Sequence, residues 1–327
     1  QHSLSPTHLL YLPSRELRGL PFEQLACVKG MFGHNVTRDF SLHLFVHRMT
    51  MPLLQSNHEE AITAFQTAMR SSTVETLTMP ETQVERNKVT LVSDPYNEDT
   101  LNTDGETLID THKRIVQSEN LSSPLHFTGD TYTPSRDDFN RILMESSGLV
   151  YTGFGRVLSA FGGSKVAGNL HLGHMKMVAL LVMASNDAAV RRQTKSDSTK
   201  TLAELKTDQA HATALLLSFR GVRSVLSVIS PVPTLLIQKA ADSLVTSMAK
   251  NKEPVFAARK SLLQHEVPVV ERYQRIGQTE AAQLPPDMAE APQGDDSGSE
   301  GEKTALLFDA YSASSLVCYG LPWVRVA

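Results

Sequence analysis

The chain has 327 residues, enough for one large domain or two smaller ones, and its 41% hydrophobic and 20% charged residues are ordinary for a soluble globular protein. A formal net charge of −4 and a pI near 6.3 give no electrostatic support for nucleic acid or an anionic membrane as a partner. The sequence contains no apolar run near the ~20 residues that span a bilayer, and Cys27 and Cys318 alone provide neither a disulfide framework nor a thiolate zinc site.

The cysteine content fits a reducing compartment, so we expect a cytoplasmic protein. The chain begins with Gln1 rather than Met and shows no charged-then-apolar signal pattern. We therefore expect it to be part of a longer protein. It contains no internal repeats.

Short stretches that are apolar almost throughout predict the strands of this chain. In chain order they cover residues 9–13, 41–47, 89–93, 148–152, 178–184, 222–229 and 314–320. Continuous apolar strands are typical of a mainly parallel sheet that is buried on both faces.

Helical patterns fall between these stretches. Residues 136–147 have helical spacing with Ser135 as a candidate N-cap, residues 202–221 form a long amphipathic run closed by Gly221, and residues 233–251 begin with Pro233. Alternation of strands and helices predicts an α/β fold, with a mainly parallel central sheet and helices on both faces.

Two polar segments stand apart from this alternation. Residues 191–200 read "RRQTKSDSTK" and predict a basic, solvent-exposed loop inserted after the strand at 178–184. Residues 281–303 are rich in Pro, Gly, Ser and acidic residues, which predicts a mobile acidic tether before the last strand. With these two insertions, residues 1–327 are expected to form a single domain.

The glycine-rich stretch at 153–165 resembles a phosphate-binding loop only in part. A Walker loop requires Lys directly after the last Gly, whereas Ser164 separates Gly163 from Lys165. A dinucleotide-binding loop requires a third Gly where this chain has Leu158. A loop that leaves a strand is the favoured interpretation, and we expect no nucleotide cofactor.

The histidines do not predict a metal site. His171 and His174 are three residues apart, but no acidic residue lies nearby and Gly173 argues against a helix. His43 and His47 are four residues apart in a stretch that we interpret as a strand, where such positions lie ~13 Å from each other.

The strand in "ALLVMASND" (179–187) ends in small residues and a hydroxyl group, which makes Ser185 a candidate nucleophile. A serine hydroxyl needs a base within hydrogen-bond reach, supplied in such sheets from the end of a neighbouring strand. The natural neighbour, "GLVYT", runs into Gly153, Phe154 and Gly155, and none of these side chains accepts a proton. The base is therefore missing where the geometry requires it.

The order of these features resembles the CHAT domain, a caspase- and separase-like cysteine-peptidase fold that is often attached to TPR repeats. The resemblance covers nearly the whole chain, and its most specific part is the strand, Pro turn and helices at 221–262. The segments that carry it are "LLYLPSRELRGLPFEQL" (9–25), "VTLVSDPYNED" (89–99), "PSRDDFNRILMESSGLVYTGFG" (134–155), "ALLVMASND" (179–187), "GVRSVLSVISPVPTLLIQKAADSLVTSMAKNKEPVFAARKSL" (221–262) and "SASSLVCYGL" (312–321).

This chain departs from the family at the positions that carry the chemistry. An ungapped reading places Phe154 at the position of the catalytic His and Ser185 at that of the nucleophilic Cys, and Ser230 replaces the usual Trp before Pro-x-Pro. A slip of one residue would place Gly153 at the His position, which is equally inert. The remaining way to supply a base is a movement of the His171 or His174 side chain towards Ser185.

The resemblance and its departures together predict a catalytically degenerate peptidase domain without a dyad, metal or cofactor. We expect it to act as a scaffold or protein-interaction module in a larger assembly, with protein partners rather than nucleic acid or membrane. A TPR array upstream is implied by the family, and the axoneme of the cilium or flagellum is one setting that we consider. The alternative is an active hydrolase with an atypical serine centre at Ser185.

Overall fold

The computed structural model describes part of the chain, and every structural statement below concerns that part. The described residues are 9–14, 17–18, 22, 28, 36–54, 82–99, 106–119, 121, 125–160, 171–183, 186–229, 232, 234–249, 316–320 and 324–326. Several sequence predictions lie outside them, namely Ser185, Ser230, the loop residues 161–165 and the acidic segment 281–303.

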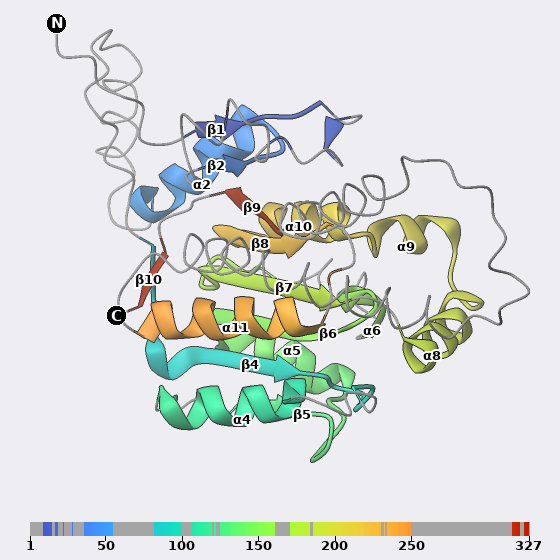
Figure 1. Cartoon of the computed structure of the whole chain (residues 1–327). Helices are drawn as coiled ribbons and strands as arrows, with labels where there is room; N and C mark the ends of the chain where they lie inside the picture. Colours follow the sequence, from blue (N-terminus) through green and yellow to red (C-terminus); the bar gives the residue numbers. More distant parts are fainter. Residues whose placement is uncertain are drawn as a thin grey trace, which may run out of the picture.

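The described strands form one large sheet with helices on both faces (Figure 1). All neighbouring strands run parallel except β8 and β9, which are antiparallel. The strand order is β1 (Leu9–Tyr11), β2 (Val36–Arg38), β9 (Leu316–Gly320), β8 (Ser224–Val228), β7 (Met177–Met183), β6 (Gly148–Phe154), β4 (Val89–Ser93) and β5 (Phe127–Thr128). This arrangement confirms the predicted α/β fold with a mainly parallel sheet.

A second sheet pairs β3 (Thr82–Val84) with β10 (Val324–Val326) in parallel register. A short 3-10 helix, η3 (Arg86–Lys88), then leads from β3 into β4. The hydrogen bond from the backbone N–H of Glu85 to Ser147 Oγ (3.0 Å) ties this corner to the start of β6.

Each face of the large sheet has its own apolar core. Helices α4 (Leu108–Ser118) and α11 (Thr234–Ala249) cover one face and pack on the side chains of Met177, Ala179 and Leu181. Helices α5 (Arg136–Glu145) and α10 (Ala210–Phe219) cover the other face, where Val178 and Leu180 point. Alternate residues of β7 therefore enter different cores, which explains why its sequence is apolar throughout.

The predicted helix signals largely hold. Ser135 caps α5, since its hydroxyl accepts a hydrogen bond from the backbone N–H of Asp138 in a capping box. Gly221 has a φ of +107° just after α10, as expected for a glycine helix stop. The run at 202–221 is two helices, α9 (Leu202–Thr207) and α10, because Asp208 is buried between them and binds Lys200 (2.7 Å).

Two predictions about local structure are wrong. In the predicted strand 41–47, residues 42–47 belong to helix α2 (Leu42–Leu54), and in the predicted loop 191–200, residues 191–197 belong to helix α8 (Asp187–Asp197). Both helices bury a polar side chain, Arg48 in α2 and half-buried Arg192 in α8. A buried arginine counts as a polar residue in the hydrophobic pattern of the sequence, so the pattern does not show the helical period. The remaining described helix, α6 (Val157–Ala160), follows β6.

A buried ion pair joins the outer strands to the centre of the sheet. Arg48 and Asp39 are 1% and 0% exposed, and Arg48 Nη2 donates to Asp39 Oδ1 (3.3 Å). Arg48 Nη1 donates to the carbonyl oxygens of Val222 (3.1 Å) and Arg223 (2.9 Å), just before β8. Burial raises the pKa of Asp39 and lowers that of Arg48, and each charge opposes the shift of the other.

The guanidinium of Arg48 also explains Gly320 at the end of β9. A Cβ atom there would lie 2.3 Å from Arg48 Nη1 and 2.3 Å from the carbonyl oxygen of Arg223, and the residue has a φ of +90°. Any side chain at position 320 would displace the arginine. The glycine at position 320, the backbone conformation that it allows and the Arg48–Asp39 ion pair therefore depend on one another.

We predict that Arg48→Met lowers the free energy of unfolding by about 3–5 kcal/mol in urea denaturation, because Asp39 is left buried without its cation. The matched control is Arg114→Met, whose half-exposed guanidinium binds Glu106 (2.8 Å) and Asp242 (3.2 Å). That exposed network should contribute about 1 kcal/mol or less. Equal losses in the two variants would contradict the anchoring role of Arg48.

Candidate functional site

The carboxyl ends of β4, β6 and β7 form the edge at which a parallel sheet places its chemistry. Phe154 and Met183 are register partners at the ends of β6 and β7, which confirms that these two strands are neighbours. The side chain of Phe154 is 5% exposed and belongs to the core between the sheet and α11. Ser185 itself lies outside the described residues, and the described chain resumes at Asn186.

A turn after β4 occupies one side of this edge. Asp94 is buried with a φ of 41°, and its two carboxylate oxygens accept hydrogen bonds from the backbone N–H groups of Glu98 (2.9 Å) and Asp99 (2.8 Å). Gly129 packs so close that a Cβ there would lie 2.1 Å from the carbonyl oxygen of Asp94. Burial raises the pKa of Asp94 while the two N–H donors oppose the shift. The carboxylate thus serves to shape the turn.

Helix α8 lies beyond the ends of β6 and β7 (Figure 1) and closes the other side of the edge. Arg192 donates two hydrogen bonds to the carboxylate of Glu98 (2.6 and 2.9 Å) and one to the carbonyl oxygen of Phe154 (3.2 Å). Its guanidinium also lies over the ring of Tyr96, 4.0 Å from the centroid. We call these residues, Tyr96, Glu98, Phe154 and Arg192, the α8 clamp.

Asn186 joins the segment after Ser185 to the same clamp. Its side-chain oxygen accepts a hydrogen bond from the backbone N–H of Ala189 and caps α8, while its amide nitrogen donates to the carbonyl oxygen of Glu98 (2.6 Å). Asn186 is a residue type that favours the N-cap of a helix, so the sequence does contain a signal for a helix start here. The polar and basic composition of residues 191–200 outweighed that signal and favoured a loop.

The histidines considered for a rescue of Ser185 lie at the wrong edge. His171 and His174 precede β7, whereas Ser185 follows it, and seven strand residues separate the two edges by about 20 Å. His174 Nε2 donates a hydrogen bond to the carbonyl oxygen of Leu143 (2.8 Å), which holds the ring there. Both rings therefore lie far from the carboxyl end of β7, where a base for a nucleophile at that strand end would be needed.

The spacing of His43 and His47 acquires a different meaning because they lie on a helix and not on a strand. Both are exposed on α2, one turn apart. Even so, the described residues include no group of three or more His, Cys, Asp or Glu side chains that could hold a metal ion. The described helices also include none that is long and apolar enough to cross a membrane.

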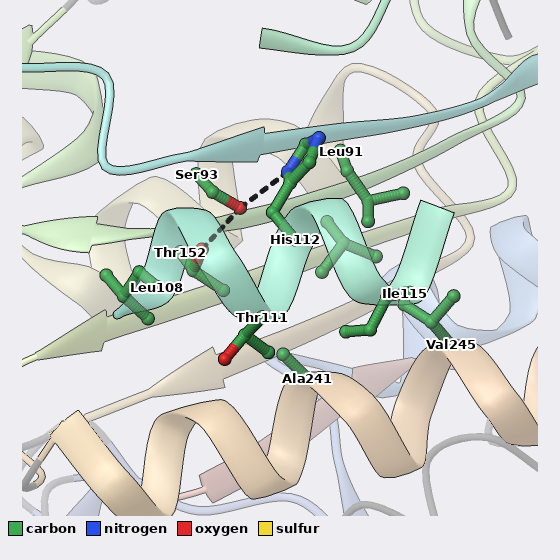
Figure 2. A pocket seen from close by; sticks show the side chains of 10 residues that line it. Leu91, Ser93, Leu108, Thr111, His112, Ile115, Thr152, Ala241 and Val245 are labelled. Carbon is green, nitrogen blue, oxygen red and sulfur yellow. Dashed lines mark hydrogen bonds between the residues drawn. The ribbon is translucent and has the colours of Figure 1, made fainter. Parts of the chain in front are cut away.

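A polar cluster that the sequence did not predict lies just inside the carboxyl edge (Figure 2). Ser93 Oγ lies 2.8 Å from His112 Nδ1, and Thr152 Oγ1 donates to Ser93 Oγ (2.9 Å). With Thr152 as its donor, Ser93 donates its own proton to His112. The three residues come from β4, α4 and β6, and no local motif announces a pair that is 19 residues apart in sequence.

The Ser93–His112 pair has the contact of a hydrolytic dyad but lacks the space for a substrate. Ser93, His112 and Thr152 are 4%, 4% and 3% exposed, and they line a cavity of about 10 Å³ together with apolar side chains of α4 and α11. A cavity of about this volume holds at most one water molecule. Burial, and then the charge of His126, lower the pKa of His112 to about 3, so the ring is neutral. The two hydroxyl groups and the imidazole hydrogen-bond to one another, so we interpret the cluster as structural.

The fold has a counterpart among solved structures. Separase in the Saccharomyces cerevisiae separase–securin complex matches 98% of this chain with a TM-score of 0.52 and 13% sequence identity. The chain has a separase-like fold. It spans only 16% of the separase chain that it matches. No protein-family model matches the chain, and no curated protein is similar to it in sequence.

This likeness confirms the separase- and caspase-like fold that the sequence resemblance implies. At 13% identity it concerns the fold alone. Membership of the CHAT family and the loss of the dyad at Phe154 and Ser185 stay predictions.

We predict that His112 makes the protein less stable as the pH falls. The folded-state pKa of about 3 lies below the ordinary histidine pKa of 6.5, so between these pH values the unfolded chain binds a proton that the folded chain does not. Stability should then fall by up to about 1.4 kcal/mol per pH unit below pH 6.5 from this residue. His112→Asn keeps an acceptor for Ser93 and cannot titrate.

Urea denaturation at pH 7.0, 5.5 and 4.5 checks this expectation. His112→Asn should show a flatter decline than the unmodified chain, and the exposed His171→Asn should reproduce the original slope. His126, whose pKa is also lowered by burial, is present in all three proteins, so part of the decline should remain in His112→Asn. Parallel pH profiles of His112→Asn and the unmodified chain would contradict the expectation.

We also predict that the α8 clamp stabilises the carboxyl edge. Arg192→Met should lower the free energy of unfolding by about 1–3 kcal/mol, because Glu98 is 6% exposed and loses its cation. The neighbouring Arg191→Met, which changes an exposed side chain of the same helix, should stay within about 0.5 kcal/mol. A double-mutant cycle with Glu98→Gln isolates the pair, and a coupling energy near zero would count against the clamp.

Proposed function

We propose that this chain is a catalytically inactive peptidase-fold domain that acts as a protein-interaction module. The observation that carries the proposal is the burial of Phe154. At the end of β6, where the sequence resemblance places the catalytic base, an apolar ring points into the core and is 5% exposed. A phenyl ring cannot take a proton from any nucleophile at the adjoining end of β7.

The α8 clamp supports the same proposal. Arg192 donates a hydrogen bond to the carbonyl oxygen of Phe154, and its guanidinium is bound by the carboxylate of Glu98 and by the ring of Tyr96. Asn186, directly after Ser185, is likewise held by Glu98 and by its own helix. These groups satisfy one another, so they are poorly suited to activate a nucleophile or to stabilise developing charge.

In this proposal the chain keeps the peptidase fold but has no catalytic activity, so the fold serves to bind a partner. The solved counterpart is a complex of separase with securin, so a protein that contains this fold is found together with a protein partner. We propose a protein partner for this chain as well, within a larger assembly of the cytoplasm. The TPR-linked members of the family that the sequence resembles suggest a repeat scaffold, and the axoneme is one such assembly.

Activity-based labelling tests the loss of catalysis. We expect no labelling of the unmodified chain by a fluorophosphonate probe above the level of the heat-denatured protein. Ser185→Ala and Ser93→Ala serve as matched variants, because each removes one candidate nucleophile.

Labelling that disappears only in Ser185→Ala would establish an active serine centre at the strand end. Labelling that disappears only in Ser93→Ala would assign activity to the Ser93–His112 pair. Either result would overturn the proposal of an inactive domain.

A further inference from the structure

A group of basic side chains without acidic partners lies at the amino edge of the sheet, opposite the candidate site. Lys176 precedes β7, while Arg220 and Arg223 lie between α10 and β8. None of the three takes part in an ion pair among the described residues, in contrast to Arg48 and Arg192, which each bind a carboxylate. We call Lys176, Arg220 and Arg223 the basic edge.

Arg223 is the most anomalous member of the basic edge. It is 7% exposed, yet no hydrogen bond or ion pair of its guanidinium is found in the described part of the chain. Its pKa is lowered by burial, with no opposing charge. Burying a guanidinium without a counter-charge is unfavourable for folding, and such a residue is a candidate for a role in binding.

The backbone holds the three residues together. Met177 and Ser224 are register partners, so Lys176 and Arg223 lie one position earlier on adjacent strands, and Ser224 N–H donates to the carbonyl oxygen of Lys176 (3.1 Å). Leu172 N–H donates to the carbonyl oxygen of Arg220 (2.7 Å), which draws the loop before β7 against the end of α10.

Charge accumulates at the basic edge. The pKa of Lys176 is lowered by burial and then by the charge of Arg223, and among the described residues its ammonium donates only to the carbonyl oxygen of Gly173 (3.3 Å). The charge of Glu85 raises the pKa of Lys176, but the Glu85 carboxylate is already paired with Lys88 (2.6 Å). Arg220 Nε is buried and has no hydrogen-bond partner.

Exposed apolar side chains accompany these cations. Phe219, the last residue of α10 and the neighbour of Arg220, is 72% exposed, and Leu215 one turn earlier is 37% exposed. Met144, near the end of α5, is 51% exposed, and the adjacent Leu143 carbonyl binds His174 in the loop before β7. Arginine, methionine and aromatic residues are the types enriched at protein–protein interfaces.

We propose that the basic edge binds the carboxylates of an acidic segment of a protein partner, with Phe219 packing against apolar side chains of that segment. Carboxylates would supply the acceptors that Arg223 and Lys176 lack. A protein segment fits better than nucleic acid because the chain as a whole carries a net charge of −4 and the cations adjoin exposed apolar side chains. The inference rests on the proposed role as an interaction module and names the chemistry of its partner.

Fluorescence anisotropy with the whole 327-residue chain tests the proposal. The acidic probe is a short fluorescein-labelled peptide in which Glu and Asp surround a Phe-Leu pair, and the neutral probe replaces each acid by its amide. We expect saturable binding of the acidic probe that weakens with salt, and at least about tenfold weaker binding of the neutral probe.

Variants assign the binding to the basic edge. Arg223→Met and Lys176→Gln should each weaken binding of the acidic probe about tenfold, and Phe219→Ala several-fold. The matched controls Arg191→Gln and Lys195→Gln remove exposed cations of α8 at the opposite edge and should leave binding unchanged. Arg223→Met should also unfold at an equal or higher urea concentration, whereas a structural role for Arg223 would lower it.

Several outcomes would overturn the proposal. They are absence of saturable binding, equal binding of both probes, equal losses in the α8 controls, and full displacement of the acidic probe by inorganic phosphate at the same concentration. Failure here is distinguishable from failure of the proposed function, because fluorophosphonate labelling concerns the opposite edge of the sheet and is measured without any peptide.

Discussion

The parallel pairing of β6 with β7 is the constraint on which both edges of this protein depend. Seven register pairs, from Gly148 with Met177 to Phe154 with Met183, run through two apolar cores. A slip of one residue would turn every side chain of β7 into the opposite core, so burial on both faces holds the register. That register brings Phe154 to one edge and Lys176 to the other.

Three arginines show how this fold treats a buried positive charge. Arg48 is paired with Asp39 and joins the outer strands to β8, and Arg192 is paired with Glu98 and fastens α8 to the carboxyl edge. Arg223 is buried to a similar degree as Glu98, but no carboxylate in the described part of the chain pairs with it. Paired buried charges stabilise an arrangement because removing either partner is costly, whereas an unpaired one costs stability that only a ligand can return.

Sequence reasoning succeeded where apolar residues alone decide the structure and failed where polar residues are buried. The strands predicted at 89–93, 148–152 and 178–184 are confirmed as β4, β6 and β7, because both faces of these strands are largely apolar. The strand predicted at 41–47 is wrong because Arg48 occupies a position in the buried face of helix α2, where the sequence pattern expects an apolar residue. The Ser93–His112 contact had no signal at all, because it joins β4 to α4 through tertiary packing.

The sequence by itself determined the α/β class and the buried central strands, and it predicted that Phe154 stands at the position of the base in the family that the chain resembles. Those properties depend on residue type and local period, which a sequence states directly. Only the tertiary structure decided that His171 and His174 lie at the edge away from Met183, that Arg192 binds Glu98, and that no described carboxylate pairs with the buried Arg223. These are contacts between elements distant in the chain, and their distances follow from packing and strand register rather than from any local pattern.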